Sequence, residues 1–516
     1  MRKSVVIVGG GTAGWITADY LARSLNAKSP EGVAVTLVES AEIGILGVGE
    51  GTFPSIRRTL QRIGVDEAAL LRECDATLKQ GAKFAHWRFT PGQEAGRPDH
   101  YMHPFAVTQA PGNLDLLPYW LLGIEGSGRN WDEVNTVQKP VADAFRAPKR
   151  IVDPPFAGPL NYAYHFDAAK LAQFLRRYGI ELGVKHVVDT VDQVALDDRG
   201  YVSGVVTRQH GTLSADLYVD CTGFRAELIG KALGVPYKPC RDVLFCDRAI
   251  ALQVPYDRPD APIASYTIST AHQAGWTWDI GLHHRRGIGH VYSADHMDDD
   301  SAEETLRRYI GPAADGLEAR RFKFTAGFRE TNWKNNCVAI GLSSGFFEPL
   351  EATGIIFAEV AAVMLSNLFP WGGHYDAAAR QFNDLMLKRY ERALDFIKLH
   401  YCLTERRDTS FWRDNADFTT VPDSLKDLLD RWRNRPPEPI DIDPNIDIFN
   451  ESSWQYVLYG MGYRTDLSAK AGVYRYYDEA RAEFADLKRQ AAYAQTVLPT
   501  NRELIAKVMG QDFKAA

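Results

Sequence analysis

The chain has 516 residues, of which 45% are hydrophobic, 24% charged and 11% aromatic. This composition is typical of a globular protein with an aromatic-rich interior, and it excludes a disordered, collagen-like or coiled-coil chain. The 59 basic and 66 acidic residues give a net charge of -7 without a long basic run, which argues against a nucleic-acid-binding protein. The length leaves room for a large enzyme, because cofactor-binding folds often exceed an average domain of about 150 residues.

The six cysteines include no Cys-x-x-Cys pair. This spacing favours reduced thiols in a cytoplasmic protein over a disulfide framework or a zinc site, so we expect no metal. The chain passes from Met1 almost directly into the strand-like run Val5 to Val8, which is too short for a signal peptide. No stretch approaches the roughly 18 apolar residues of a membrane-spanning helix. The sequence therefore predicts a cytoplasmic chain that does not enter a membrane.

The first residues predict a dinucleotide-binding unit. The strand from Val5 to Val8 is followed by a glycine-rich turn, an apolar-periodic helix from Trp15 to about Leu25, and a second strand that ends at Glu39. The turn fits Gly-x-Gly-x-x-Gly, in which the glycines allow a tight turn, a close approach of pyrophosphate, and packing of helix on strand. A carboxylate at the end of the second strand suits a ribose hydroxyl. The expected cofactor contacts are Gly9, Gly11, Thr12, Ala13, Gly14 and Glu39.

Two later segments are predicted to return to a flavin site. Residues 191–219 alternate in the manner of a β-meander and lead into Asp220-Cys221-Thr222-Gly223, a pattern common in two-domain flavoproteins. Residues 338–342 read as a short buried strand with a glycine near its end. An amphipathic helix is predicted from Asp167 to Tyr178. The expected cofactor contacts in these two segments are Val191 and Leu342, and Gly49 and Ile355 are two further expected contacts.

The expected fold is an α/β flavoprotein with a Rossmann-type dinucleotide-binding module, a β-meander and a largely helical substrate module. The pattern is helical from Pro54 to about Gly81, whereas residues 90–160 are rich in proline, glycine and aromatic residues, which is typical of long functional loops. The nucleotide-binding module is expected at residues 1–78 and 160–375, and the substrate module at residues 79–159 and 376–516.

Three residues allow both a structural and a functional interpretation. Trp276 and Trp278 alternate on a predicted strand and therefore point to one face, either as core aromatics or as a wall that keeps a substrate away from a flavin. Lys79 is predicted in a helix end or turn, where a lone lysine normally faces solvent. The local pattern leaves these alternatives open.

A second group of residues surrounds a predicted helix start. Glu348 and Glu351 are three residues apart and precede Thr353 and Gly354. If a helix begins there, the free N–H groups of its first turn form a seat for a small anion. The alternative is that the two carboxylates only complement the positive end of the helix dipole.

Six segments, taken together and in order, resemble the FAD-dependent tryptophan halogenase family. The resemblance runs from Val5 to about Arg413. The chain also has no second Gly-x-Gly-x-x-Gly unit for a nicotinamide cofactor. The six segments are Gly47 to Ser55, the stretch around Lys79, His103-Pro104-Phe105, Gly275 to Ile280, Phe346 to Ile355, and His400 to Arg413.

The resemblance implies a flavin-dependent halogenase. In this family FADH2 reacts with O2 and with bound chloride or bromide, and the resulting hypohalous acid travels through a tunnel to a lysine. By similarity Lys79 would activate the acid, as a hydrogen-bonded molecule or as a haloamine, and Glu351 would position the electrophile or take up the arenium proton. Thr353 and Gly354 would bind the halide, and the tryptophan pair would block direct hydroxylation of the substrate.

The implied substrate is an indole or another electron-rich arene. His103 and Phe105 would sandwich an indole by stacking, and Trp454 lies in the segment Asp447 to Tyr463. Family members that use free tryptophan carry a Tyr-Tyr and a Phe-Trp pair there, and this segment is shorter. We therefore expect indole, another small indolic or phenolic arene, or a larger indole-bearing molecule rather than free tryptophan, and a more open site would also favour bromide.

Three smaller departures from the family pattern leave its core chemistry in place. They are Gly281 where the family usually has proline, Ala352 where it usually has serine, and His290 where it often has tyrosine.

The resemblance also implies partners. A separate NAD(P)H-dependent flavin reductase would supply FADH2, the substrate would be a small aromatic molecule, and a homodimer is compatible with the sequence. Two other functions remain as alternatives. A flavin-dependent aromatic hydroxylase would turn over without halide, and a non-catalytic flavin-binding protein would not need Lys79 and Glu351 together with the tryptophan pair.

Overall fold

The computed structural model describes residues 2–42, 44, 49–94, 96, 98–107, 114–124 and 128–510. The first two residues of the segment Gly47 to Ser55 lie outside this part of the chain. The chain divides into two compact units. Unit 1 comprises Met1–Ala76, Phe166–Cys240 and Thr325–Glu391, and unit 2 comprises Thr77–His165, Arg241–Phe324 and Arg392–Ala516.

This division differs from the expected modules mainly in residues 241–324. The sequence analysis placed them with the flavin module, whereas they belong to unit 2. The reason is a strand pairing that the local pattern does not reveal, because Thr267 of a later strand pairs in parallel with Ala82 of an earlier one.

The main sheet of unit 1 has six strands, of which five are parallel and one edge strand is antiparallel. Its central strand is β1, whose sequence SVVIV is apolar and almost fully buried, as expected for a strand covered on both faces. The sheet runs in the order β20 (Trp333–Lys334), β21 (Cys337–Ala339), β12 (Leu217–Asp220), β1 (Ser4–Val8), β2 (Ala34–Glu39) and β8 (Lys185–Val188).

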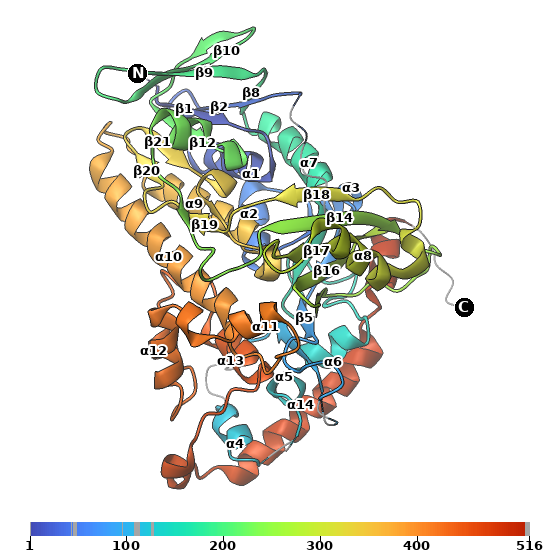
Figure 1. Cartoon of the computed structure of the whole chain (residues 1–516). Coiled ribbons are helices and arrows are strands. Elements are labelled where there is room, and N and C mark those ends of the chain that lie inside the picture. The colour runs from blue at the N-terminus through green and yellow to red at the C-terminus, as the bar shows by residue number, and fades with distance from the viewer. Residues whose placement is uncertain are drawn as a thin grey trace. The chain divides into compact units, whose positions relative to one another are not determined.

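Helix α1 (Thr12–Ser24) packs between α7 (Ala168–Glu181) and α9 (Thr353–Asn367), as Figure 1 shows beside the sheet. The predicted strand, turn, helix and strand at the N-terminus are therefore confirmed, as is the helix that follows Asp167, whose carboxylate caps α7. Unit 1 also contains α2 (Ser55–Ile63), α3 (Glu67–Glu73), β3 (Gly49–Gly51), the sheet β9 (Val191–Leu196), β10 (Val202–Thr207) and β11 (Gly211–Leu213), and the sheet β13 (Lys238–Pro239), β19 (Gly327–Phe328) and β22 (Gly345–Phe346).

Unit 2 is built on a seven-stranded sheet. The sheet runs in the order β18 (Arg320–Lys323), β14 (Arg248–Pro255), β17 (Arg285–Tyr292), β16 (Gly275–Gly281), β15 (Thr267–Ala271), β5 (Gly81–Ala85) and β6 (His100–Pro104). Helix α8 (Asp299–Ile310) covers β14 and β17 with an apolar face that includes Ala302 and Leu306. The strand β4 (Thr77–Lys79) pairs with β7 (Ala163–Asp167), which begins in unit 2 and ends in unit 1.

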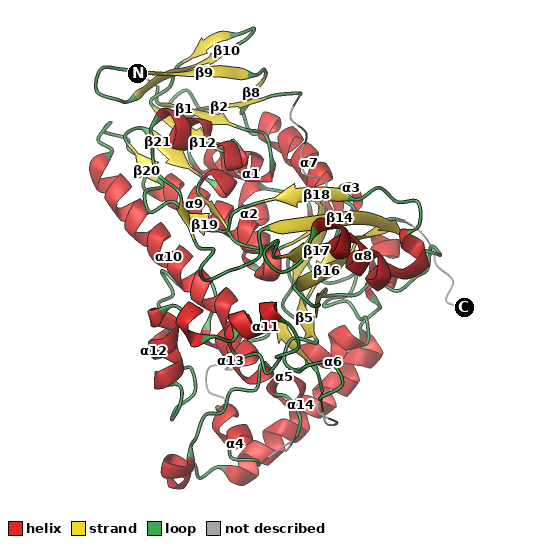
Figure 2. Ribbon diagram, viewed as in Figure 1, coloured by secondary structure: helices red, strands yellow, loops and turns green. Residues whose placement is uncertain are grey.

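From α10 onwards the elements are helices, drawn in red in Figure 2. Helix α10 (Asp376–Cys402) begins in unit 1 and ends in unit 2. The other helices of unit 2 are α4 (Leu117–Leu121), α5 (Trp131–Val134), α6 (Gln138–Asp143), α11 (Ser410–Asn415), α12 (Asp423–Arg431), α13 (Glu451–Gly460), α14 (Tyr477–Val497) and α15 (Asn501–Val508). Residues 90–160 thus contain β6 and three short helices as well as loops. None of the described helices combines the length and apolar character needed to cross a membrane.

Candidate active site

The glycine-rich turn of unit 1 has the geometry of a pyrophosphate seat. A Cβ atom at Gly9 would lie 2.2 Å from the carbonyl oxygen of Cys221, and one at Gly14 would lie 1.9 Å from the carbonyl oxygen of Gly9. At Gly11, by contrast, no heavy atom lies within 4 Å of such a position. The first and third glycines are therefore required by packing, and the second leaves open space at the start of α1, where Thr12 and Ala13 form the first turn. These residues fit FAD.

Glu39 lies at the end of β2 beside this turn. A Cβ atom at Gly10 would collide with the Glu39 carboxylate, so the side chain lies directly over the turn. Its Oε1 atom is 2.7 Å from Nε2 of His186. The carboxylate is thus held in place next to the turn, where a ribose hydroxyl is expected in this type of unit.

The two later segments of unit 1 do converge on the turn. Asp220 is buried and accepts hydrogen bonds from the backbone of Thr222 (3.0 Å) and Ile229 (2.8 Å). Gly341 has a positive φ of 77°, and a Cβ atom there would lie 2.7 Å from Cβ of Ala13. Leu342 follows directly in a short 3-10 turn. The predicted order of segments around the flavin site is therefore matched by the packing of unit 1.

The remaining expected flavin contacts occupy ordinary structural positions. Gly49 begins β3 and is buried. Val191 begins β9 and packs against the apolar core of unit 1. Ile355 is buried in α9. Their contact with a flavin stays a prediction.

The predicted helix start at Thr353 is confirmed, because α9 begins at that residue. Its N-cap, Ala352, has a left-handed φ of 56° and makes no side-chain capping bond. The Thr353 hydroxyl is buried and has no hydrogen-bond partner in the part of the chain that the structure describes. No heavy atom lies within 4 Å of a Cβ position at Gly354. The helix start thus combines free N–H groups, an unpaired hydroxyl and open space, which suits a small anion. Glu348 and Glu351 are buried next to it in sequence.

Lys79 lies on β4, so its prediction in a helix end or turn was wrong. The helical pattern before it ends at Glu73, and the chain then pairs with β7. The lysine is only 3% exposed, which is rare for an ammonium group without a functional or paired environment. Its Nζ atom lies 5.4 Å from the ring centroid of Phe105.

Hydrogen bonds from several elements fix the strand that carries Lys79. The Thr77 hydroxyl donates to the carbonyl oxygen of Gly281 (2.6 Å), and the Asn501 amide donates to that of Leu78 (3.1 Å). The backbone N–H of Gln80 donates to the carbonyl oxygen of Ser265 (2.6 Å). The backbone at Lys79 is therefore well determined on both sides.

An aromatic cluster brings together the predicted substrate residues of unit 2. The ring centroids of His103 and Phe105 are 6.5 Å apart, and Phe396 lies 5.7 Å from His103. Trp454 packs edge-on against Phe396 with ring centroids 4.9 Å apart, and Phe449 stacks on Phe396 with ring centroids 3.9 Å apart. Helix α13, which carries Trp454, packs against β6, which carries His103. The sequence analysis missed Phe396 and Phe449, because an apolar residue in a helical or loop pattern carries no signal that separates a site from a core.

Trp276 and Trp278 lie on β16, as predicted, with ring centroids 6.4 Å apart. Trp276 is fully buried and lies 6.3 Å from Trp87. The Trp278 ring occupies the space over Gly289 of the neighbouring strand, where a Cβ atom would collide with it. The pair therefore has the packing of core aromatics, and its second task as a wall stays a prediction.

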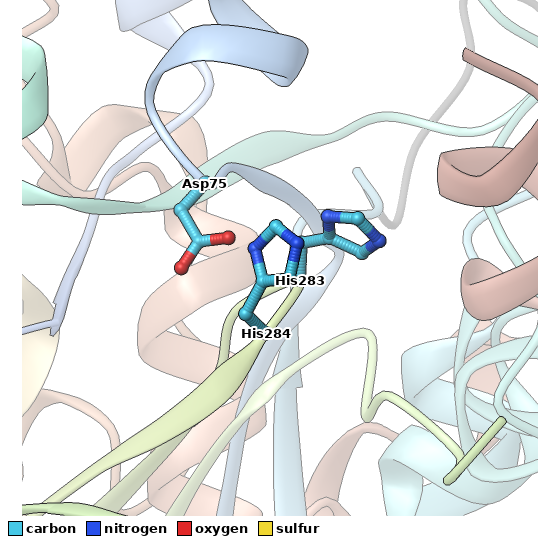
Figure 3. Close-up of side chains that lie close together, drawn as sticks. All are labelled: Asp75, His283 and His284. Carbon is cyan, nitrogen blue, oxygen red and sulfur yellow. The ribbon is translucent and has the colours of Figure 1, made fainter. Parts of the chain in front are cut away.

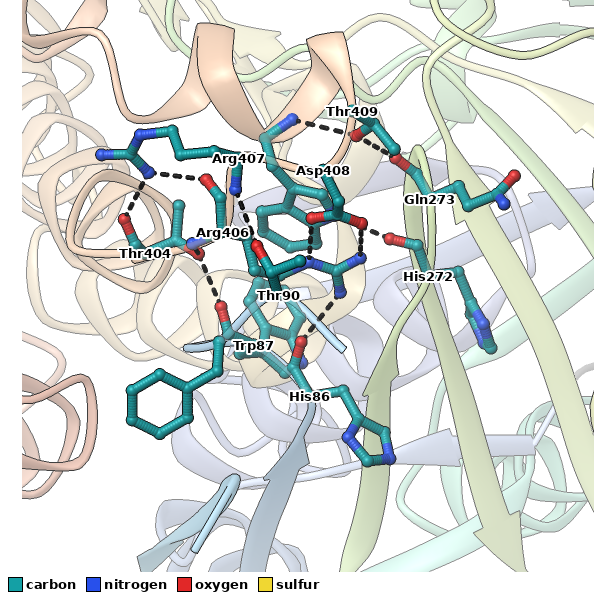
Figure 4. Close-up of polar contacts among 12 residues, drawn as sticks. His86, Trp87, Thr90, His272, Gln273, Thr404, Arg406, Arg407, Asp408 and Thr409 are labelled. Atoms are coloured by element: carbon teal, nitrogen blue, oxygen red, sulfur yellow. Dashed lines mark hydrogen bonds and ion pairs between the residues drawn. The ribbon is translucent and has the colours of Figure 1, made fainter. Parts of the chain in front are cut away.

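The segment from His400 to Arg413 anchors this aromatic region (Figure 4). The buried Arg406 guanidinium binds Asp408 (2.7 Å) and donates to the carbonyl oxygen of His86 (2.8 Å). The Thr404 hydroxyl donates to the carbonyl oxygen of Trp87 (2.7 Å). These bonds fix the loop after β5, so this part of the family pattern has a structural role.

His283 and His284 place two imidazole rings side by side, with centroids 3.9 Å apart (Figure 3). The six cysteines are all free thiols. The expectation of a site without a metal stays a prediction.

Comparisons with known proteins place these features in a family. The family model for tryptophan halogenases matches residues 4–474. The tryptophan 6-halogenase SttH of Streptomyces toxytricini is 39% identical, with 98% of each chain covered. The structure of a tryptophan halogenase from Shewanella frigidimarina aligns with a TM-score of 0.93 at 40% identity, covering 99% of this chain and 98% of that one. BrvH, a flavin-dependent halogenase from Brevundimonas, aligns with a TM-score of 0.86 at 32% identity, covering 98% and 99%.

Proposed function

Because the chain belongs to the tryptophan halogenase family and is an FADH2-dependent halogenase of indoles, we propose that Lys79 and Glu351 carry its chemistry. The observation that carries this proposal is the burial of Lys79 beside Phe105, in the same unit as the aromatic cluster. A charge at such a position is costly unless it has a partner or a task.

Unit 1 binds the flavin and the halide in this proposal. When bound, FADH2 would supply two electrons and chloride or bromide the other two, so that with one proton O2 is reduced to hypohalous acid and water. The open space at Gly11 accepts the pyrophosphate, and the α1 dipole favours its negative charge. The halide binds the first-turn N–H groups of α9 at Thr353 and Gly354, with the buried Thr353 hydroxyl as a further donor.

Lys79 activates the hypohalous acid. Its ammonium group donates a hydrogen bond to the oxygen of the acid and so polarises the bond to the halogen, and a neutral amine would instead form a haloamine. Glu351 positions the electrophile and accepts the proton that leaves the ring carbon after attack. Both side chains are buried, which keeps competing water away from the oxidant.

His103, Phe105 and Trp454 hold the aromatic substrate. Aromatic side chains bind an indole through offset or edge-to-face contacts, and these residues belong to one cluster. The names of the relatives make free tryptophan the competing substrate. The shortened segment before Trp454 favours an indole without the amino-acid group.

Product analysis tests this function. The enzyme is supplied with a flavin reductase, FAD, NADH, O2 and equal concentrations of chloride and bromide, and indole and tryptophan compete for it. We expect halogenated indole as the main product by mass. A hydroxylated product formed without halide would instead support the hydroxylase alternative, and bound FAD without any product would support a flavin-binding protein.

The finer assignments of partner and compartment are also part of the proposal. A separate NAD(P)H-dependent reductase delivers FADH2 in the cytoplasm, where the free thiols are compatible with a reducing environment. Activity with any of several unrelated reductases, or with chemically reduced FAD, would indicate that FADH2 arrives by diffusion.

A further inference from the structure

His165 lies on the same face of a strand pair as Lys79. In the antiparallel register of β4 and β7, Thr77 is opposite His165 and Lys79 is opposite Ala163. Residues two apart on a strand point to one face, so the four side chains share that face and His165 is the diagonal neighbour of Lys79. The Thr77 hydroxyl on this face already donates to the carbonyl oxygen of Gly281.

The imidazole of His165 is fully buried and has one fixed contact. Its Nε2 atom lies 2.8 Å from the hydroxyl oxygen of Thr267 on β15. Its Nδ1 atom is buried and has no hydrogen-bond partner among the described residues. A buried ring nitrogen without a partner costs free energy, which marks it as a position where a ligand can bind.

The imidazole is neutral at neutral pH. Burial, and secondly the positive charge of Lys79, hold its pKa well below the usual 6.5. A neutral imidazole has one protonated and one unprotonated nitrogen. If Nε2 donates to the Thr267 hydroxyl, Nδ1 is the unprotonated nitrogen and can accept a hydrogen bond.

We propose that His165 is a further binding residue for the hypohalous acid, whose O–H group donates a hydrogen bond to His165 Nδ1 while its oxygen accepts one from the Lys79 ammonium. Hypohalous acid has one O–H donor and an acceptor oxygen, and Lys79 alone satisfies only the acceptor. In a dry, aromatic environment the unpaired O–H group would cost binding free energy. Held at both ends, the acid is oriented with its halogen directed away from the two protein groups. This inference rests on the proposed function of Lys79.

Substitutions at His165 can separate the two ring nitrogens. An asparagine amide reaches the position of Nδ1 but not that of Nε2, whereas a glutamine amide reaches the position of Nε2 and can keep the contact with Thr267. The readout is halogenated indole per molecule of hypohalous acid, with the escaped acid captured by an added chlorine-accepting dye. Thr267→Val serves as the matched control, since it removes the contact and leaves both nitrogens.

We expect H165Q to lower the product per hypohalous acid about tenfold, because it alone removes the proposed hydrogen bond to the acid. H165N and Thr267→Val lose only the contact with Thr267 and should lower the product less than about threefold. The inference would be overturned if H165Q and the wild type gave the same product per hypohalous acid, or if H165N lost more of it than H165Q. His165 would then only hold the local structure through its contact with Thr267.

A measurement on the unmodified enzyme covers the case in which a variant does not fold. Nitrogen NMR of histidine-labelled protein should show the neutral His165 protonated on Nε2, and protonation on Nδ1 would overturn the inference. A Lys79→Ala arm identifies the source of a failure. If Lys79→Ala gives as much halogenated indole per hypohalous acid as the wild type, the proposed function fails. If Lys79→Ala loses this yield and H165Q keeps it, only the role of His165 is contradicted.

Discussion

The ammonium group of Lys79 lies over the ring of Phe105, 5.4 Å from its centroid. A cation at this distance is attracted by the negative face of the ring quadrupole, and this attraction partly offsets the cost of burying the ammonium group. The contact links the proposed catalytic group to a proposed substrate-binding residue. A substrate that stacks on Phe105 would therefore also change the environment of the lysine.

Replacing Lys79 should separate the two halves of the reaction. We expect Lys79→Ala to lower halogenation at least about 100-fold, because a positioned proton donor commonly contributes that much. Release of free hypohalous acid should continue, since the proposed flavin and halide residues belong to unit 1. The matched control is Lys83→Ala, which removes a lysine that pairs with Asp143 at a half-buried position. Loss of hypohalous acid in Lys79→Ala would contradict the assignment.

The hydroxyl of Thr353 should set the affinity for halide. Thr353→Val keeps the shape of the side chain and removes its donor, so we expect the KM for bromide to rise about tenfold, as for the loss of one hydrogen bond to a charged group. Thr353→Ser keeps the hydroxyl and should stay close to the wild type. Steady-state kinetics at varied bromide measure both. An unchanged KM in the valine variant would remove Thr353 from the halide site.

The glycine turn offers a pair of substitutions with opposite effects. Gly14→Ala places a Cβ atom 1.9 Å from the carbonyl oxygen of Gly9 and should lower the melting temperature markedly. Gly11→Ala meets no atom within 4 Å, so the protein should fold normally but bind FAD more weakly, because the methyl group enters the space reserved for pyrophosphate. Thermal unfolding and flavin titration distinguish the two. Wild-type flavin affinity in Gly11→Ala would count against a flavin at this turn.

Phe449 should matter for both stability and substrate binding. It is buried and stacks on Phe396, so Phe449→Ala is expected to cost about 3 kcal/mol of unfolding free energy, near the usual range for removing a buried phenylalanine. The KM for indole should rise while the rate of hypohalous acid formation stays the same. Phe449→Leu retains most of the volume and serves as the control. An unchanged KM for indole in the alanine variant would confine Phe449 to the core.

Glu359 should make the stability of unit 1 depend on pH. It is buried on α9 and accepts hydrogen bonds from Thr59 (2.7 Å) and Ser55 (3.3 Å) of α2. Burial raises its pKa from 4.5 to about 8. Since the folded pKa exceeds the unfolded one, its contribution is fully present below pH 4.5 and is lost as the pH rises through about 8. Denaturant unfolding of Glu359→Gln should show a gain over the wild type at pH 9 and little difference at pH 4.5. An equal pH dependence in both proteins would show that Glu359 is ionised throughout.

Local sequence signals were sufficient to predict the N-terminal strand, turn and helix and the start of α9, because these elements depend on short contiguous motifs. The turn at Gly9 to Gly14 and the helix start at Thr353 both depend on backbone requirements that a few neighbouring residues reveal. Lys79 shows where such signals end. The helical periodicity of the preceding sequence extends through Lys79. Residues 77–79 nevertheless form a strand, because they pair with β7, in which Lys79 lies opposite Ala163.

Contacts between distant segments explain the other differences between the sequence predictions and the structure. Residues 241–324 join unit 2 because β15 pairs with β5, and a local pattern does not specify a partner. Phe396 and His165 carry no motif of their own. Their proposed roles follow from the residues that lie beside them, which only the folded chain defines.

The hydrogen bond from Asn501 to the carbonyl oxygen of Leu78 joins the strand of the proposed catalytic lysine to one of the last helices of the chain. All segments of unit 1 lie before residue 392. During synthesis on the ribosome, all of unit 1 has therefore been made well before Asn501 emerges and the strand of Lys79 receives this bond. The order of translation thus allows a nascent chain to complete the proposed flavin unit first and the support of the proposed catalytic lysine last.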